Sequence, residues 1–160
     1  MSEHGAPGAA APARQPYIRD VEFPSTYVVY QAPIHMSCAA AMCGFSPPKS
    51  SGEYGYCELG CSSGATLNPL AAANPKAQFF GVDFNTEHIR KARSTAKTAS
   101  LDNVTYIEAS FEDLAAHDLP TFDFISMSIE RTFGWWMMET RSAEGSFQSL
   151  TLAPCLRSLA

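Results

Sequence analysis

The sequence has little positive charge. It holds 11 Lys and Arg against 16 Asp and Glu, which gives a formal net charge of −5 at pH 7. Proteins bind phosphate backbones through clustered Lys and Arg, and no such patch stands out here. The basic residues between Arg90 and Lys97 fit the solvated face of a helix. We therefore expect no nucleic acid partner.

Long apolar stretches are also missing. No run approaches the roughly 18 to 20 apolar residues that cross a bilayer, so we expect no membrane partner. Residues 1–16 contain an early acid and lack the apolar core of a secretion signal. We expect this segment to be a disordered tail and the protein to be soluble and cytoplasmic.

Cysteine spacing excludes two further classes of protein. The chain has 5 cysteines, an odd number, and no CxxC pair. A disulfide framework and a zinc site are therefore not expected, and no His cluster lies near Cys57 or Cys61 to complete a metal site. We predict no metal site and expect both thiols to pack as small buried side chains. Reduced thiols suit the cytoplasm.

The stretch 54–83 has the pattern of one βαβ unit. An apolar run at Tyr54–Leu59 enters the small-residue loop Gly60–Gly64, and a helix-compatible segment follows. A second apolar run then ends on Asp83. Nucleotide-type ligand sites have this order, because glycines let the backbone approach the ligand and a carboxylate after the next strand meets a ribose.

The rest of the chain, sized for one domain at 160 residues, continues the alternation. The predicted elements are, in order, a lead-in over 17–50 with a helix at Pro33–Cys43, a helix at Glu87–Ala99, a strand at Val104–Glu108, a short helix reaching Ala116, and a strand at Phe122–Met127. The right-handed crossover rule makes such strands parallel. We predict an α/β fold with a Rossmann-like parallel sheet, flanking helices and strand order 3-2-1-4.

Two of these helices carry sharper signals. Ile89, Ala92, Ala96 and Ala99 fall on one face of the helix at Glu87–Ala99, which predicts an amphipathic helix. Ser110 stands three residues before Asp113, which is the pattern of a capping box at a helix start.

Several motifs in order resemble the class I S-adenosylmethionine-dependent methyltransferases, and more narrowly a bacterial branch that carries a methyltransferase regulatory domain. The resemblance covers about Tyr17 to Met127. The matching pieces are Glu58-Leu59-Gly60-Cys61 with Gly64, Leu70 to Pro75, Gly81 to Asn85, Asn103-Val104, Ala109-Ser110-Phe111 and Phe122 to Ile125. The resemblance implies a cofactor-binding core over 51–127, S-adenosylmethionine as cofactor, and methyl transfer to an acceptor, either a protein side chain or a small molecule.

The resemblance also implies roles for single residues. Glu58 would orient the methionyl amino group, and Asp83 would accept both ribose hydroxyls. The cofactor-binding loop would comprise Gly60, Cys61, Ser62 and Gly64. Three further residues would lie near the adenine: Phe84, Ser110 and Phe111. No residue is marked as a catalytic base.

Ser62 departs from the family loop, which usually reads Gly-Cys-Gly-x-Gly. If the backbone needs a positive φ at this position, serine costs on the order of 1 kcal/mol or more. We therefore expect a reduced affinity for the cofactor.

Two other functions compete with methyl transfer. A non-catalytic cofactor-binding module, or a decayed remnant, would fold without turnover. An NAD-linked oxidoreductase would share Asp83, but a dinucleotide site uses G-x-G-x-x-G to meet a pyrophosphate at a helix start, and Glu58 would repel phosphates.

After Met127 the sequence stops resembling the family. Trp and Met each have one standard codon, so the shifted frame of Trp135 to Met138 and Glu139 encodes Val-Asp-Asp-Gly, as in the family's own segment. We hypothesise a frame shift near Ser126 to Ser128, with 128–160 as an atypical tail. A genuine alternative end or a deliberately shortened chain is the competing explanation. We expect weak or absent catalysis, because the remaining residues cannot supply three more strands.

Overall fold

The computed structural model describes residues 26–114 and 117–127. They form a four-stranded parallel sheet in the order β3-β2-β1-β4. The strands are β1 Gly55–Leu59, β2 Gln78–Asp83, β3 Val104–Glu108 and β4 Phe124–Met127. The predicted α/β fold and strand order are confirmed. The predicted segments 1–16 and 128–160 lie outside the described residues.

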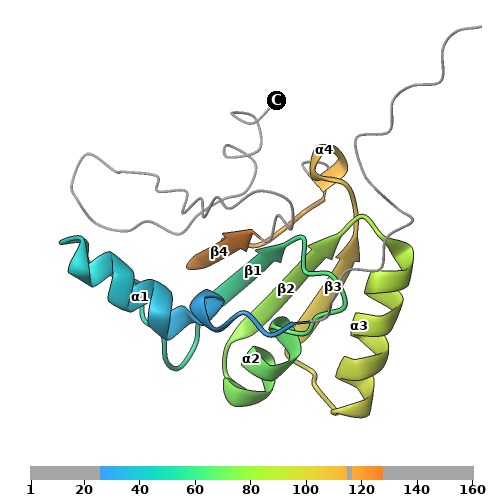
Figure 1. Cartoon of the computed structure of the whole chain (residues 1–160), viewed down its shortest axis with the longest axis horizontal. Coiled ribbons are helices and arrows are strands. Elements are labelled where there is room, and N and C mark those ends of the chain that lie inside the picture. Colours follow the sequence, from blue (N-terminus) through green and yellow to red (C-terminus); the bar gives the residue numbers. More distant parts are fainter. Residues whose placement is uncertain (1–25, 115–116, 128–160) are drawn as a thin grey trace, which may run out of the picture.

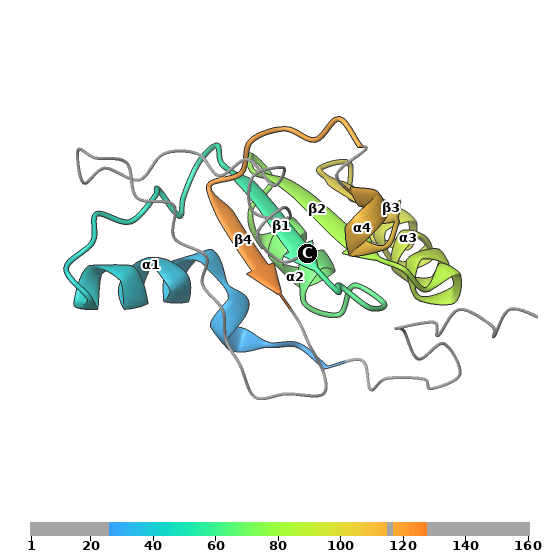
Figure 2. The same cartoon turned by 90° about the horizontal axis from the view of Figure 1, so that it is seen from above.

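Helices connect the strands and flank the sheet (Figure 1). They are the 3-10 turn η1 Val29–Gln31, α1 Pro33–Met42, α2 Leu67–Ala73, α3 Thr86–Thr98 and α4 Phe111–Leu114. Viewed from above, α1 lies beyond the β4 edge of the sheet and α3 lies at the β3 side (Figure 2). No helix in the described ranges is long and apolar enough to cross a membrane.

The helix ends follow the local signals in the sequence. Pro33 occupies the first turn of α1, and Gly44 after its end has φ +82°. Asn85 caps α3 by accepting from the N–H groups of Glu87 and His88. The helix predicted to reach Ala116 ends at Leu114 in the described residues.

The predicted apolar face of α3 was wrong at one residue, Ala99. Ile89, Ala92 and Ala96 are buried, as expected, but Ala99 is exposed. The helix ends at Thr98, so Ala99 is its C-cap, and the helical path stops at Ser100, which has φ +54°. Because α3 ends one residue before Ala99, the helical periodicity no longer sets the direction of the Ala99 side chain.

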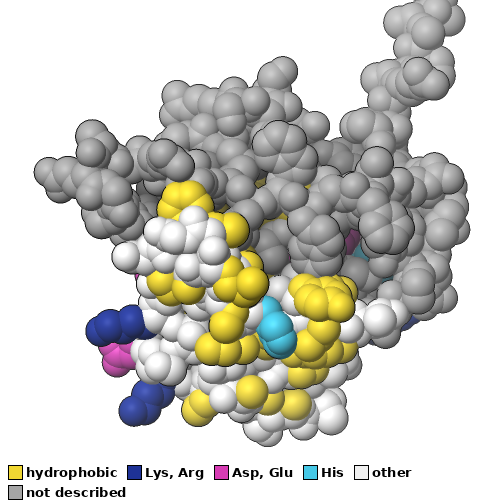
Figure 3. All heavy atoms as spheres, turned by 60° about the vertical axis from the view of Figure 1, so that its left-hand side comes forward, with side chains coloured by type: hydrophobic (Ala, Val, Ile, Leu, Met, Phe, Trp, Pro, Cys, Tyr) yellow, Lys and Arg dark blue, Asp and Glu magenta, His cyan; other side chains and the backbone are white. Residues whose placement is uncertain are grey.

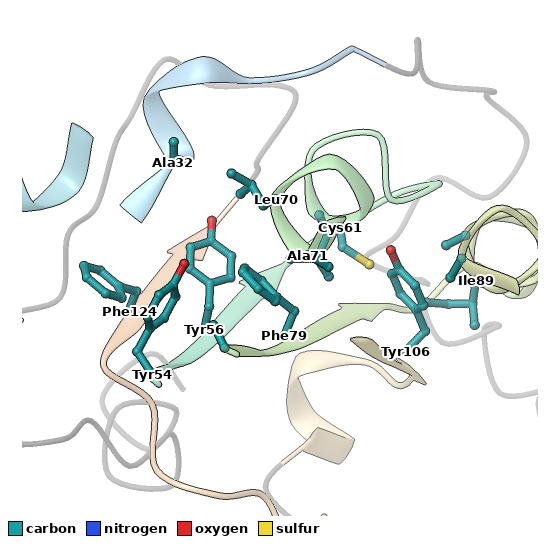
Figure 4. Close-up of a cluster of buried hydrophobic side chains, with 14 residues drawn as sticks. Ala32, Tyr54, Tyr56, Cys61, Leu70, Ala71, Phe79, Ile89, Tyr106 and Phe124 are labelled. Carbon is teal, nitrogen blue, oxygen red and sulfur yellow. The ribbon is translucent and has the colours of Figure 1, made fainter. Parts of the chain in front are cut away.

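The sheet buries two apolar clusters, one on each face. The larger cluster lies under α2 and α3, and its aromatic members rise from all four strands: Tyr54, Tyr56, Phe79, Tyr106 and Phe124 (Figure 4). The second cluster includes Cys57, Leu59 and Val82 from the sheet and Leu114 from α4. Side chains alternate between the faces of a strand, so Glu58 shares the face of Tyr54 and Tyr56.

Buried polar groups join the elements beside the core. The Tyr56 hydroxyl donates to the Gln31 carbonyl at 2.9 Å and lies 2.7 Å from Ser126 Oγ, which ties η1 to β1 and β4. Asn103 Nδ2 lies within 3.1 Å of three carbonyl oxygens around the end of α2: those of Ala71, Asn74 and Ala77. These contacts join η1 to the sheet and hold the end of α2 to the segments that precede β2 and β3.

The surface around η1 and α1 is apolar (Figure 3). Its large exposed hydrophobic residues are Tyr27, Val29, Tyr30, Ile34 and Met42. The sequence from 26 to 48 contains no charged residue, so no charge interrupts this surface within the segment.

Candidate functional site

The carboxyl ends of β1 and β2 carry two acidic side chains at the point where the strand order reverses. β1 pairs with β2 on one side and with β4 on the other. The later strands are therefore added on opposite sides of β1, and the strand order reverses beside it. Ligands of open α/β sheets bind in the crevice at such a point. Glu58 and Asp83 therefore lie where the fold provides a ligand site.

The loop after β1 is fixed onto the end of β2. The N–H groups of Gly60 and Cys61 both donate to the Val82 carbonyl, at 2.8 and 3.0 Å. Gly60 and Gly64 have φ of +74° and +75°, and Ser62 has φ +48°. The condition under which serine would be strained is thus met. At Gly64 an added Cβ would also overlap the Tyr106 hydroxyl.

Asp83 is held by backbone N–H groups from both sides. Its side chain is buried, with 6% of the residue exposed. Oδ2 accepts from Ser62 N at 2.9 Å and Oδ1 accepts from Asn85 N at 2.8 Å. Each oxygen of a carboxylate has two lone pairs. The carboxylate is thus oriented by the protein and retains acceptor capacity.

Glu58 lies in the opposite situation. It is 2% exposed, and its Oε2 has no hydrogen-bond partner among the described residues. Burial, and secondarily the charge of Asp83, raise the pKa of the Glu58 carboxyl to about 8. An acid buried in this way favours either its protonated form or a cationic partner.

The other predicted loop residue, Cys61, contributes its backbone. Its side chain is buried in the larger core cluster, and burial raises the pKa of its thiol well above the usual range. Burial likewise raises the pKa of the Cys57 thiol. Both cysteines are free and buried, as predicted. Within the described residues no group of three His, Cys, Asp or Glu is arranged to hold a metal ion.

The residues predicted to lie near the adenine are close to Asp83 in sequence or in the sheet. Phe84 follows it directly and is half-buried. Ala109 N donates to the Asp83 carbonyl at 3.1 Å, so Ser110 and the start of α4 at Phe111 follow beside the end of β2. Ser110 Oγ accepts from Asp113 N at 3.1 Å and lies 2.7 Å from Asp113 Oδ2, so the predicted helix cap is confirmed.

His88 is a site residue that the sequence analysis did not select. It is 6% exposed, and its Nδ1 lies 3.5 Å from Asp83 Oδ1. The sequence signal that could have identified His88 is the helix cap at Asn85, which starts α3 directly after β2. The first turn of such a helix faces back toward the strand end, so His88 returns to Asp83.

Comparisons with known proteins agree with this geometry. The family model described as a methyltransferase domain matches residues 50–138. The Synechocystis sp. protein sll1526 is 34% identical over 131 residues, which cover 82% of this chain and 26% of that protein. A tRNA (guanine-N(7)-)-methyltransferase of Rubrobacter xylanophilus is 36% identical over 73 residues, covering 44% of this chain and 33% of that enzyme.

Among solved structures, PKMT2 from Rickettsia typhi in complex with AdoHcy aligns with a TM-score of 0.61 and 27% sequence identity. The alignment covers 66% of this chain and 20% of that one. The chain therefore spans about a quarter or less of the length of these first two relatives, sll1526 and PKMT2.

Proposed function

This chain belongs to the class I S-adenosylmethionine-dependent methyltransferases, and we propose that it binds S-adenosylmethionine at the ends of β1 and β2 and transfers its methyl group to an acceptor. The observation that carries the proposal is the pair of buried carboxylates. Asp83 accepts from a backbone N–H group at each oxygen, while Glu58 Oε2 is buried and has no partner among the described residues. Such a pair suits a ligand with a ribose at one end and a cationic amino group at the other.

Glu58 fits the amino end of that ligand. A buried, partnerless carboxylate gains from a cation that enters its site, because the ion pair offsets the loss of hydration. The raised pKa of Glu58, about 8, means that pairing with an ammonium group would release a proton at neutral pH. A phosphate would instead meet a repulsive group, which argues against NAD.

Asp83 fits the ribose end. The lone pairs not used by Ser62 N and Asn85 N remain on separate oxygens, so each oxygen can accept one hydroxyl of a vicinal diol. The spacing from Gly64 to Asp83 is close to the roughly 20 residues expected for a ribose carboxylate. Phe84, Ser110 and Phe111 are proposed to border the adenine, since the chain places them next to Asp83.

The loop at 60–64 supplies close backbone approach. Its positive φ angles at Gly60, Ser62 and Gly64 turn the chain over β2, and Cys61 directs its side chain into the core. Ser62 Oγ is buried with no partner among the described residues, and its side chain would crowd a bound ligand. The proposal thus assigns backbone contacts to the loop and side-chain contacts to the two acids.

When bound, S-adenosylmethionine supplies an electrophilic methyl group that an acceptor displaces directly. The role of this chain is therefore to bind and align, and alignment provides much of the rate enhancement in such reactions. We propose a protein side chain or a small molecule as acceptor. The net charge of −5 does not favour nucleic acid, and the free thiols favour a cytoplasmic location.

Calorimetric titration of the full chain with S-adenosylmethionine, S-adenosylhomocysteine and NAD tests the proposal. We expect binding of the first two ligands and none of NAD. A labelled-methyl assay on the same sample then separates an enzyme from a non-catalytic module, which would bind without turnover. Binding of NAD alone, or of no ligand, would overturn the proposed function.

A further inference from the structure

We propose that His88 is a positioning residue of the cofactor site, which fixes the carboxylate of Asp83 for the ribose. This inference rests on the function proposed above. It extends that function because it assigns part of the cofactor affinity to a residue that lies behind the ribose-binding carboxylate.

The geometry places the imidazole directly against one oxygen of the carboxylate. His88 Nδ1 and Asp83 Oδ1 are 3.5 Å apart, and the two side chains are only 8% and 7% exposed. This distance is too long for a full hydrogen bond, so His88 leaves the acceptor capacity of Oδ1 available. With a proton on Nδ1 the ring attracts the carboxylate, and water screens this attraction little because both side chains are buried.

The position of the ring is set by the start of α3. Asn85 N donates to Asp83 Oδ1 at 2.8 Å, and Asn85 Oδ1 accepts from His88 N at 3.3 Å. Asp83, Asn85 and His88 therefore form one closed turn between the strand and the helix. Because this turn fixes the backbone of His88, the direction of its ring toward Oδ1 follows from the fold.

The ring also borders the groove beside the site. His88 lines the groove between α2 and α3, together with Gly64 and Asn68. Its Nδ1 lies 3.5 Å from Asp83 Oδ1, and both side chains are largely shielded from water. Removing the ring would leave space for water beside Oδ1, while Ser62 N and Asn85 N would still hold the carboxylate. A bound ribose would then have to compete with that water for Oδ1.

The test compares two substitutions of similar shape. Asn and Leu side chains have the same number of heavy atoms and branch at the same carbon, but His88→Asn retains an amide donor and His88→Leu does not. Each variant and the wild type are titrated calorimetrically with S-adenosylhomocysteine and with its analogue that lacks both ribose hydroxyls. Ile89→Val is the matched control, since Ile89 is the neighbouring buried residue of α3 and packs in the core.

We expect His88→Leu to weaken S-adenosylhomocysteine binding on the order of fivefold, the size of one modest polar interaction. His88→Asn should stay within about twofold of the wild type, and the analogue should bind all three proteins equally. Ile89→Val should lower the unfolding midpoint and leave both affinities unchanged. A purely structural role for His88 would instead weaken both ligands equally.

Two results would overturn the inference while the proposed function stands: equal losses for the two ligands in His88→Leu, or equal affinities in His88→Leu and His88→Asn. If the wild type binds neither ligand, the proposed function itself is overturned. This outcome differs from the two results above, in which the wild type binds.

Discussion

Glu58 and Asp83 end neighbouring strands of one sheet, yet the protein treats the two carboxylates differently. Asp83 accepts hydrogen bonds from two backbone N–H groups and faces His88. Glu58 is more deeply buried, and its Oε2 has no partner among the described residues. One carboxylate is thus preorganised by the fold, whereas the other has an oxygen that no described residue satisfies.

The difference has opposite consequences for stability. The N–H groups around Asp83 need its carboxylate, so that acid contributes to the folded state. Glu58 has a pKa of about 8 in the folded protein against 4.5 as its ordinary value. The folded state therefore retains a proton that the unfolded state releases. Stability from this group is present at low pH and is lost as pH rises from about 4.5 to about 8.

The largest effect is expected from Asp83→Ala. The substitution removes the proposed ribose acceptor and leaves the N–H groups of Ser62 and Asn85 without their partner. Two hydrogen bonds to a charged group predict a loss of S-adenosylhomocysteine affinity of about 100-fold or more. The free energy of unfolding should fall by about 2 kcal/mol. Calorimetry and urea unfolding measure the two quantities.

Asp113→Ala is the control for this prediction, because Asp113 is an exposed acid that contacts only the cap of α4 in the described residues. It should leave the affinity unchanged. An Asp83→Ala protein that still bound the ligand within threefold of the wild type would remove Asp83 from the site.

Glu58→Gln should have the second largest effect, and its sign differs between binding and stability. We expect ligand affinity to fall about tenfold at pH 8, because the amide cannot form the proposed ion pair. We expect the loss of stability between pH 5 and pH 8.5 to shrink by a few kcal/mol, because the amide of Gln has no proton to release in this range. Urea unfolding at several pH values measures this difference.

The result for Glu58 can be read against Glu53, which is exposed and precedes β1. Glu53→Gln should reproduce the wild-type pH profile of unfolding. If Glu58→Gln and the wild type gave parallel profiles, the contrast between the two carboxylates would not hold.

Ser62→Gly should have a smaller effect, and a favourable one. Ser62 has a positive φ that glycine adopts freely, and its hydroxyl is buried with no partner in the part of the chain that the structure describes. Glycine should therefore raise the free energy of unfolding by about 1 kcal/mol. Ligand affinity should rise a few-fold as the crowding is removed. A fall in affinity would show that the hydroxyl contacts the ligand, and Ser63→Gly in the same loop provides the comparison.

Most of the fold was predictable because local signals and the crossover rule agree. The apolar runs gave the strands, β3 has the predicted bounds, and the right-handed crossover placed the order 3-2-1-4. The prediction for Ala99 was wrong because hydrophobic periodicity does not mark where a helix ends. The loop and both acids lie at one edge of the sheet, since the carboxyl ends of parallel strands meet there.

What the sequence did not provide was the state of those residues. Glu58 is buried, and its Oε2 has no partner within residues 26–114 and 117–127, only once the sheet has formed, so no local pattern encodes this state. His88 was missed because its relation to Asp83 depends on the turn that Asn85 forms. The roles of Phe84, Ser110 and Phe111 at the adenine remain predictions, as does the frame shift after Met127.

The smallest predicted effect measures the coupling between the two acids. Asp83→Asn keeps the shape of the side chain but removes its charge. Burial is the larger cause of the raised Glu58 pKa and the charge of Asp83 is the smaller one. The pKa of Glu58 should therefore fall in Asp83→Asn but stay above its ordinary value of 4.5, because the desolvation of Glu58 is retained. Carbon NMR of the Glu58 carboxyl follows this titration directly. An unchanged pKa would mean that the two carboxylates do not interact, and each would then have to be treated as a separate site.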